Sequence, residues 1–210
     1  PYPFKGLCGA GVAWKLACAT LKVEQPLRAP IPDGWEKWLL DMAGLATIAD
    51  MVPLTDENRV LARFGLLVLR KSPRLGLRKL CEAMRGDQRT LTEDDVGFML
   101  APRVNAASRM GDPRDAFTLF TTEDAAEAER LAKLLEKSNR QRKAEAGAIT
   151  RAVHARLKGK EIPSVIALGD PDWRPALLGL VAGGIAEEYE RPVFLWGREG
   201  SGALKGSVRS

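Results

Sequence analysis

The sequence predicts an α/β protein in which a mainly helical region precedes a strand–helix–strand unit. Two observations lead to this prediction. Residues 122–157 contain no proline and a single glycine, Gly147, and their apolar residues recur at helical spacing. After residue 160 two short apolar runs, 165–168 and 193–196, flank a segment of helical length. We therefore expect three regions, over residues 1–121, 122–158 and 159–210.

The first region contains several helical segments. Expected helices cover residues 7–21, 35–44 and 55–69, with a proline-rich connector over 26–32. Thr55 and Thr92 have the character of N-cap residues, because acidic residues that favour the first turn of a helix follow each of them.

Asp50 lies in the apolar run from Leu45 to Leu54. The length of the run and Pro53 near its end predict a buried strand or the buried end of a segment. Because a buried ionised carboxylate is costly, Asp50 needs a hydrogen bond, a salt bridge or a metal cation. The alternative is a capping or turn aspartate ahead of Pro53.

Residues 100–113 combine arginines, an amide, small residues and turn formers without a clean period. This composition is typical of a functional loop. Arg103 and Arg109 are its candidate functional residues, and the alternative is that both are structural ion-pair partners.

The spacing of apolar residues predicts a long helix in the second region and short strands around a helix in the third region. A helix of about 35 residues would be about 50 Å long at 1.5 Å per residue, which suits a connector between domains. The alternative is two helices broken near Gly147. Beyond it, strands over 165–168 and 193–196 enclose a helix over 176–189, and a third strand begins near Ala203. A parallel strand pair is expected.

Composition limits the class of protein. The 210 residues carry a net charge of +5, which favours a polyanionic partner such as nucleic acid. Three cysteines without a Cys-x-x-Cys pair argue against a disulfide framework or a zinc site and favour the cytoplasm. No apolar stretch reaches the ~20 residues of a membrane helix, so no membrane partner is expected. Both ends look cut, which predicts a fragment of a longer protein.

Five ordered segments resemble RecJ-type single-strand-specific exonucleases of the DHH phosphoesterase superfamily. These are residues 8–16, residues 45–59 with the runs Leu-Ala-Thr-Ile-Ala-Asp and Glu-Asn-Arg, the run Arg-Val-Asn-Ala-Ala-Ser-Arg over 103–109, residues 173–182 and residues 205–210. The resemblance implies the C-terminal part of a DHH catalytic domain, a connector helix and an incomplete DHHA1 domain.

The resemblance also implies roles for individual residues. Asp50 matches a ligand of the catalytic Mn²⁺ or Mg²⁺ pair, most of whose ligands lie upstream of this chain. The catalytic candidates near the scissile phosphate are Arg103, Asn105 and Arg109. The candidates for binding substrate phosphate are Ser207, Arg209 and Arg174, with Ser207 and Arg209 in a loop that holds the terminal phosphate.

The chain departs from the family pattern at several positions. Ser108 and Val208 replace glycines, and Arg174 replaces a histidine. Val208 is expected to constrain the phosphate-binding loop. Because His154 is the only histidine, the Asp-His-His motif is absent, and we expect the isolated chain to have little or no nuclease activity.

The function that the resemblance implies is hydrolysis of single-stranded DNA by the intact protein, from 5′ to 3′, in DNA repair and recombination. Single-stranded DNA and other DNA-repair proteins are the expected partners. Two alternatives stay open: an oligoribonuclease or cyclic-dinucleotide phosphodiesterase of the same superfamily, and a non-catalytic nucleic-acid-binding module.

Overall fold

A computed structural model describes residues 2–23, 31–198, 200 and 202–210. The chain forms two compact units. Unit 1 comprises Pro1–Asn105 and Pro113–Glu136, and unit 2 comprises Ala106–Asp112 and Lys137–Ser210. The boundary between the two units falls inside two helices. It therefore differs from the region limits at residues 121 and 158 that the sequence predicts.

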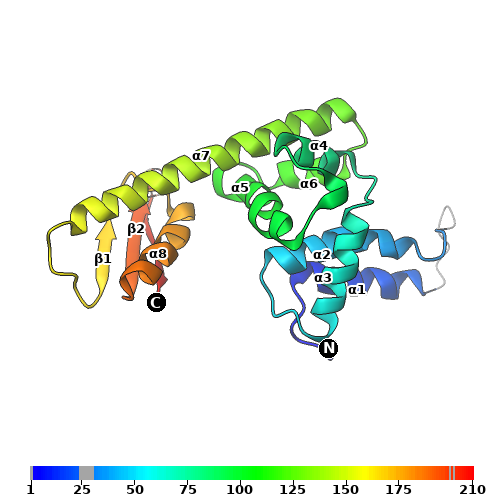
Figure 1. Ribbon diagram of the computed structural model, residues 1–210, viewed down its shortest axis with the longest axis horizontal. Coiled ribbons are helices and arrows are strands. Elements are labelled where there is room, and N and C mark those ends of the chain that lie inside the picture. Colours follow the sequence, from blue (N-terminus) through cyan, green and yellow to red (C-terminus); the bar gives the residue numbers. More distant parts are fainter. Residues whose placement is uncertain (1, 24–30, 199, 201) are drawn as a thin grey trace. The chain divides into compact units, whose positions relative to one another are not determined.

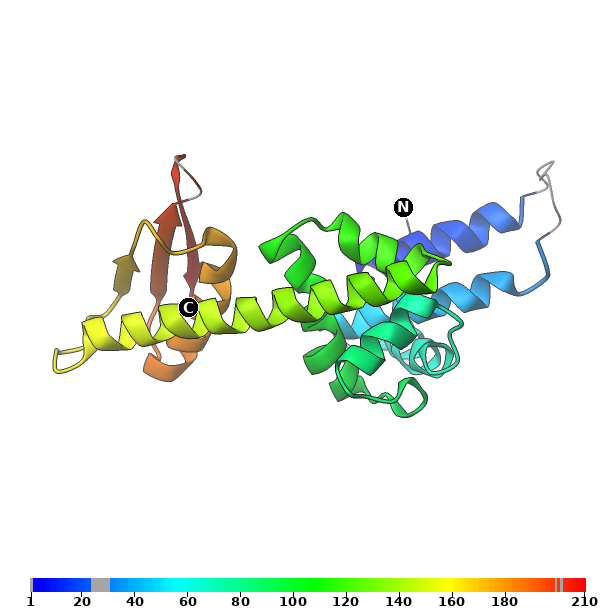
Figure 2. The same cartoon turned by 90° about the horizontal axis from the view of Figure 1, so that it is seen from above.

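Unit 1 is helical (Figures 1 and 2). Its elements are α1 (Gly9–Leu21), the 3₁₀ helix η1 (Trp35–Leu39), α2 (Leu40–Ala49), α3 (Asp56–Leu69), α4 (Leu75–Ala83), the 3₁₀ turn η2 (Gln88–Thr90), the π-helical η3 (Asp95–Leu100), the first half of α5 (Ala101–Met110), α6 (Arg114–Thr121) and the start of α7 (Ala125–Leu157). The predicted helix over 7–21 is confirmed. The predicted connector over 26–32 lies outside the described residues as far as residue 30.

Two glycines bring α2 and α3 into close contact. A Cβ built on Gly44 would lie 2.5 Å from the Cα of Gly65, and a Cβ built on Gly65 would lie 2.5 Å from the Cα of Gly44. Only residues without a side chain allow two helix backbones to approach in this way. This crossing holds α2 firmly against α3.

The apolar run from Leu45 to Leu54 is not a strand. Residues up to Ala49 belong to α2, and the turn after the helix contains Asp50. Much of α2 is buried, including Ala43, Leu45 and Thr47. A helix buried on most of its faces has a continuous apolar sequence and therefore resembles a buried strand.

Both predicted N-caps precede helices. Thr55 stands before α3, although its side chain makes no capping bond. Thr92 forms a reciprocal pair with Asp95: its backbone N–H donates to Asp95 Oδ2 at 2.9 Å, and the Asp95 N–H donates to Thr92 Oγ1 at 3.2 Å. This is a capping box with aspartate in place of glutamate.

The long helix is confirmed, and α7 runs without a break through Gly147. Figures 1 and 2 both show it as one uninterrupted ribbon. Its second part packs in unit 2. Within the described ranges, no helix combines the length and apolar character needed to cross a membrane.

Unit 2 contains the predicted strand–helix–strand unit. Its elements after α7 are β1 (Ile166–Gly169), α8 (Pro175–Tyr189), β2 (Val193–Arg198) and β3 (Leu204–Arg209). β1 pairs with β2 in parallel, as predicted, and β2 pairs with β3 antiparallel in the order β1-β2-β3. The fold class is α/β, mostly helical with a small mixed sheet.

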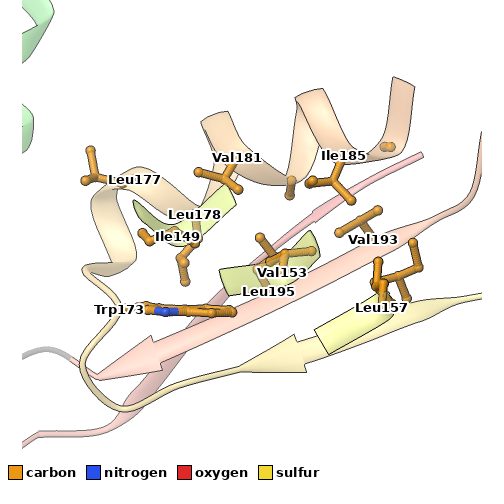
Figure 3. Close-up of a cluster of buried hydrophobic side chains, with 13 residues drawn as sticks. Ile149, Val153, Leu157, Trp173, Leu177, Leu178, Val181, Ile185, Val193 and Leu195 are labelled. Carbon is orange, nitrogen blue, oxygen red and sulfur yellow. The ribbon is translucent and has the colours of Figure 1, made fainter. Parts of the chain in front are cut away.

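One face of this sheet carries the core of unit 2 (Figure 3). α7 contributes Ile149, Val153 and Leu157, which are buried together with apolar residues of α8 and of β2. The alternating burial of β2 directs Val193 and Leu195 into this core. The core fixes α8, and with it the turn that precedes α8, against the sheet.

Candidate functional site

Asp50 is an exposed carboxylate at the end of α2. Its backbone N–H donates to the carbonyl of Ala46 at 2.9 Å, and the residue is the C-cap of the helix. The expectation of a buried carboxylate is therefore wrong. Among the described residues, no group donates a hydrogen bond to its side chain or forms an ion pair with it. A negative charge at a helix C-terminus meets the negative end of the helix dipole, so a cation there would be favourable.

Asp50 does not make a complete metal site within the part of the chain that the structure describes. That part holds no group of three or more His, Cys, Asp or Glu side chains that could bind a metal ion. Mg²⁺ and Mn²⁺ need several clustered oxygen ligands. The described residues therefore do not form a whole metal site, and the role of Asp50 as one ligand of it stays a prediction.

The segment around Arg103 is a helix and not the expected loop. Ala106 and Ala107 are buried in α5, and these small residues let the helix pack closely. Arg103 is 9% exposed; its Nε donates to Glu136 Oε2 at 2.6 Å and its Nη1 donates to the Met99 carbonyl at 2.7 Å. The geometry of Arg103 therefore favours the structural ion-pair alternative.

Asn105 belongs to the same helix but has a different environment. Its side chain is exposed, whereas Arg103 is buried in unit 1. Asn105 is the last residue of the first segment of unit 1, and Arg109 belongs to unit 2. The catalytic role of Asn105 stays a prediction.

Unit 2 contains an open cavity of about 780 Å³ that brings together Arg109 and Arg174. Arg109 Nη1 donates to the carbonyl of Ala176 in the first turn of α8 at 2.8 Å. Arg174, the N-cap of α8, donates from Nε to Glu145 Oε2 at 3.0 Å. Three helical or turn segments that are distant in sequence thus meet at one cavity, whose lining also includes the acidic residues Glu145 and Asp172.

Two further arginines were not singled out from the sequence. Arg198, at the end of β2, lines the same cavity. Arg142 of α7 is held by Asn139, whose Oδ1 accepts from Arg142 Nη2 at 2.9 Å and from Nε at 3.2 Å. Asn139 is buried. The only feature of the sequence that could have drawn attention to Arg142 is its position three residues after Asn139, on the same face of α7.

The electrostatic environment of Arg142 favours an anion beside it. Burial, and then the positive charge of Arg109, lower the pKa of Arg142. None of the described carboxylates forms an ion pair with Arg142 or Arg109. Two neighbouring guanidinium groups without an ion-pair partner attract an anion, and the N–H groups that Asn139 and Ala176 leave unused can donate to its oxygens.

The turn before α8 is held by Arg156. Its Nη2 donates to Asp170 Oδ2 and its Nη1 to the Gly169 carbonyl, at 2.6 and 2.7 Å. The Arg156 guanidinium also lies 4.9 Å from the centre of the Trp173 ring. These contacts place Trp173, which lines the cavity, and the residue after it, Arg174.

An Asp170→Asn variant is expected to change the acid stability of the protein. The Asp172 backbone N–H, and next the Arg156 guanidinium, lower the pKa of Asp170 from its ordinary 3.8. A lowered folded-state pKa stabilises the protein above the unfolded-state pKa, and this contribution disappears as the pH falls through the folded-state value. The wild-type advantage in Tm over Asp170→Asn should therefore be present at pH 6 and should shrink below pH ~4. Thermal unfolding at several pH values measures it, with Asp172→Asn as the control; an advantage that is constant with pH would contradict the assignment.

Ser207 and Arg209 lie on β3 and face α8. A Cβ built on Gly179 would lie 2.9 Å from Arg209 Nη2 and 3.4 Å from Ser207 Oγ. Gly179 therefore leaves room for both side chains. Neither residue lines the cavity of Arg109 and Arg174.

The segment that contains Ser207 and Arg209 is a strand and not the expected loop. Val208 pairs with Phe194 in the antiparallel register of β2 and β3. A β-branched residue suits a strand. Val208 therefore lies in extended backbone, and by the alternation of a strand it points to the sheet face opposite that of Ser207 and Arg209.

No family model matches the chain. The single-stranded-DNA-specific exonuclease RecJ of Bacillus subtilis is 39% identical over 211 residues, which cover 100% of this chain and 25% of that protein. RecJ of Haemophilus influenzae is 36% identical over 217 residues, again over the whole chain and 38% of the relative. This chain is homologous to RecJ over its whole length. It spans about a quarter to two fifths of the RecJ proteins that it matches.

Solved RecJ structures show the same fold. The crystal structure of Thermus thermophilus RecJ in complex with Mn²⁺ is 37% identical, with a TM-score of 0.74 over 86% of this chain and 26% of that chain. A crystal structure of exonuclease RecJ bound to manganese covers 99% of this chain and 50% of its own, with 34% identity and a TM-score of 0.78. The α/β fold is therefore that of the corresponding RecJ region.

Proposed function

We propose that the protein containing this chain is an exonuclease that hydrolyses the phosphodiester bonds of single-stranded DNA with Mn²⁺ or Mg²⁺. The observation that carries the proposal is the homology to RecJ along the entire chain, at 39% identity to the Bacillus subtilis protein. Action from 5′ to 3′, a role in DNA repair and recombination with other repair proteins, and a cytoplasmic location belong to the same proposal.

Asp50 is proposed as one metal ligand. It offers a solvent-facing carboxylate at a helix end where a cation is favourable. When bound, the metal pair supplies charge stabilisation for the attacking and leaving oxygens of the phosphodiester. The remaining ligands would come from outside this chain.

The arginines of unit 2 are proposed to bind substrate phosphates. Arg109, Arg174 and Arg198 line one cavity, and the uncompensated charge of Arg142 raises the positive potential beside Arg109. Asn105 is proposed to lie near the scissile phosphate. Arg103 is proposed to stabilise the fold of unit 1 and not to bind substrate, because its guanidinium already donates to Glu136 and to the Met99 carbonyl.

Ser207 and Arg209 are proposed to hold the terminal phosphate of the strand. A hydroxyl and a guanidinium that share one face of β3 provide donors suited to a phosphate monoester. A pocket for this group would let the enzyme engage a strand end and not the strand interior.

The decisive experiment gives the intact protein 5′-labelled single-stranded DNA of several lengths with Mn²⁺. We expect release of mononucleotides from long strands, loss of the reaction in EDTA and much slower cleavage of blunt duplex. Preference for oligoribonucleotides of a few residues would favour the oligoribonuclease alternative. Binding without hydrolysis would favour the non-catalytic alternative. The isolated 210-residue chain should show little or no cleavage, because its described residues lack a metal-binding cluster.

A further inference from the structure

A second basic cavity lies in unit 1 and contains none of the residues assigned above. It is open, has a volume of about 880 Å³, and is formed by the segment from the end of α3 to η2. Its basic lining residues are Arg70, Lys71, Arg74, Arg78 and Arg89, and its acidic ones are Glu82 and Asp87. The cavity therefore has a positive formal charge.

Pairing with groups outside the lining leaves this imbalance in place, because Asp41 neutralises Arg74 and Lys79 neutralises Glu82. Glu82 accepts from Lys79 at 2.8 Å, so a base outside the lining neutralises one of the two acids. Lys71, Arg78 and Arg89 are exposed, and none of the described acidic side chains forms an ion pair with them. Three exposed cationic side chains thus surround the cavity without a direct ion-pair partner among the described residues, although Asp87 lies in the same lining.

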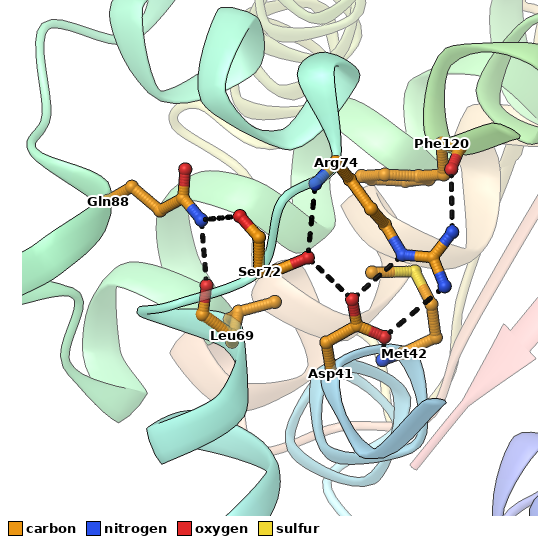
Figure 4. Close-up of polar contacts among 7 residues, drawn as sticks. All are labelled: Asp41, Met42, Leu69, Ser72, Arg74, Gln88 and Phe120. Atoms are coloured by element: carbon orange, nitrogen blue, oxygen red, sulfur yellow. Dashed lines mark hydrogen bonds and ion pairs between the residues drawn. The ribbon is translucent and has the colours of Figure 1, made fainter. Parts of the chain in front are cut away.

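The walls of the cavity are held by buried polar contacts (Figure 4). Asp41, which is buried, accepts from Arg74 Nε at 2.8 Å and from Ser72 Oγ at 2.7 Å. Arg74 Nη1 also donates to the carbonyl of Phe120 at 2.8 Å. The loop between α3 and α4 is therefore fixed at its centre.

Gln88 ties the opposite wall to the same loop. Its Nε2 donates to the carbonyls of Leu69 and Ser72 at 2.9 and 2.8 Å (Figure 4). This contact sets the position of the neighbouring Arg89 relative to Lys71, the residue before Ser72. The cationic groups are consequently presented on a rigid scaffold and not on a free loop.

We propose that this cavity, named here the α3–η2 cavity, binds the phosphodiester backbone of single-stranded nucleic acid. The inference rests on the proposed function, because the strand that it binds is the substrate. Guanidinium and ammonium groups around an open cavity suit successive phosphates, and such contacts do not depend on base sequence. Anchoring here keeps the strand bound between successive cleavage events.

The test compares two triple variants of the intact protein in EDTA, where no hydrolysis occurs. Lys71→Gln, Arg78→Gln and Arg89→Gln together remove the exposed charges of the α3–η2 cavity. Arg63→Gln, Arg130→Gln and Lys137→Gln remove three exposed charges elsewhere and are the control. Fluorescence anisotropy with labelled oligo(dT) gives Kd at several salt concentrations, and circular dichroism verifies that both variants fold.

The cavity variant should bind oligo(dT) about tenfold more weakly than the wild-type protein at 0.1 M salt. The slope of log binding constant against log salt concentration should become shallower by about 2, because each of three lost phosphate contacts contributes about 0.7 on a single strand. The control should change neither quantity by a comparable amount. Equal changes in both variants would overturn the proposal. So would tighter, cavity-dependent binding of polyglutamate than of oligo(dT), which would indicate an acidic protein partner.

Cleavage in Mn²⁺ separates this inference from the proposed function. If the wild-type protein does not cleave but the cavity variant loses affinity, the proposed nuclease function fails and the binding site stands. If the wild-type protein cleaves and the cavity variant binds normally, the nuclease function stands and the binding site fails.

Discussion

An Asp50→Asn variant of the intact protein is expected to lose Mn²⁺-dependent cleavage of single-stranded DNA by about 100-fold or more, since loss of even an outer-shell partner of a metal costs about 10–100-fold. Asparagine keeps the shape of the side chain but removes the charge that a divalent cation requires. The measurement is the initial rate of mononucleotide release as a function of Mn²⁺ concentration.

Stability should not explain this loss. The Asp50 side chain is exposed and, within the described part of the chain, has no partner. Removing a negative charge from a helix C-terminus is neutral or stabilising, by about 0.3–1 kcal/mol. Asp50→Asn should therefore unfold at the wild-type temperature or slightly above it.

The matched control is Asp33→Asn, because Asp33 is also an exposed aspartate in a turn of unit 1. It should keep wild-type activity. A fully active Asp50→Asn variant, or an equal loss in Asp33→Asn, would exclude the metal-ligand role of Asp50 while leaving the RecJ homology untouched.

Asp50 also illustrates a limit of sequence periodicity. The run from Leu45 to Ala49 is apolar because α2 is largely surrounded by other helices. The run is too short for its period to separate a buried helix from a buried strand. The aspartate ends the element in either case, and its role as a metal ligand stays a prediction.

The region around Arg103 could not be predicted for a different reason. The arginines and the amide of this region made a helix, whose small residues are buried, look like a loop. The ion-pair partner of Arg103, Glu136, lies 33 residues away in the sequence. Glu136 also has an i,i+4 neighbour, Arg140, so local pattern alone suggests another pairing. Long-range pairing of this kind leaves no local signal.

The regular elements were easier to predict. α7 has a long uninterrupted period, and the apolar runs at β1 and β2 are separated by one helix. The cavity of unit 2 was not predictable as a unit, because Arg109, Arg174 and Arg198 come from three separate elements. Only the fold brings these charges together.

A Gly76→Ala variant is expected to destabilise the protein strongly. Gly76 lies in the first turn of α4 and is buried. A Cβ at this position would lie 1.7 Å from the backbone oxygen of Leu119 in α6. A backbone oxygen inside a helix cannot rotate away, so α4 and α6 must separate.

The expected net cost follows from two opposing effects. Overpacking in a dense core costs about 1–3 kcal/mol. Alanine has a better helix propensity than glycine by about 1 kcal/mol, which offsets part of this cost. Because the overlap involves the backbone of α6, the upper part of the range applies, and we expect a net loss of about 2 kcal/mol.

Gly184→Ala is the control that separates these effects. Gly184 is inside α8, is exposed, and a Cβ built on it would have no neighbouring atom within 4 Å. The same substitution there should stabilise by up to about 1 kcal/mol, through helix propensity alone. Urea unfolding of both variants tests the pair of expectations. If Gly76→Ala were as stable as Gly184→Ala, the close α4–α6 contact would not exist in the folded protein, and the geometry that places Arg74 beside Phe120 would have to be revised.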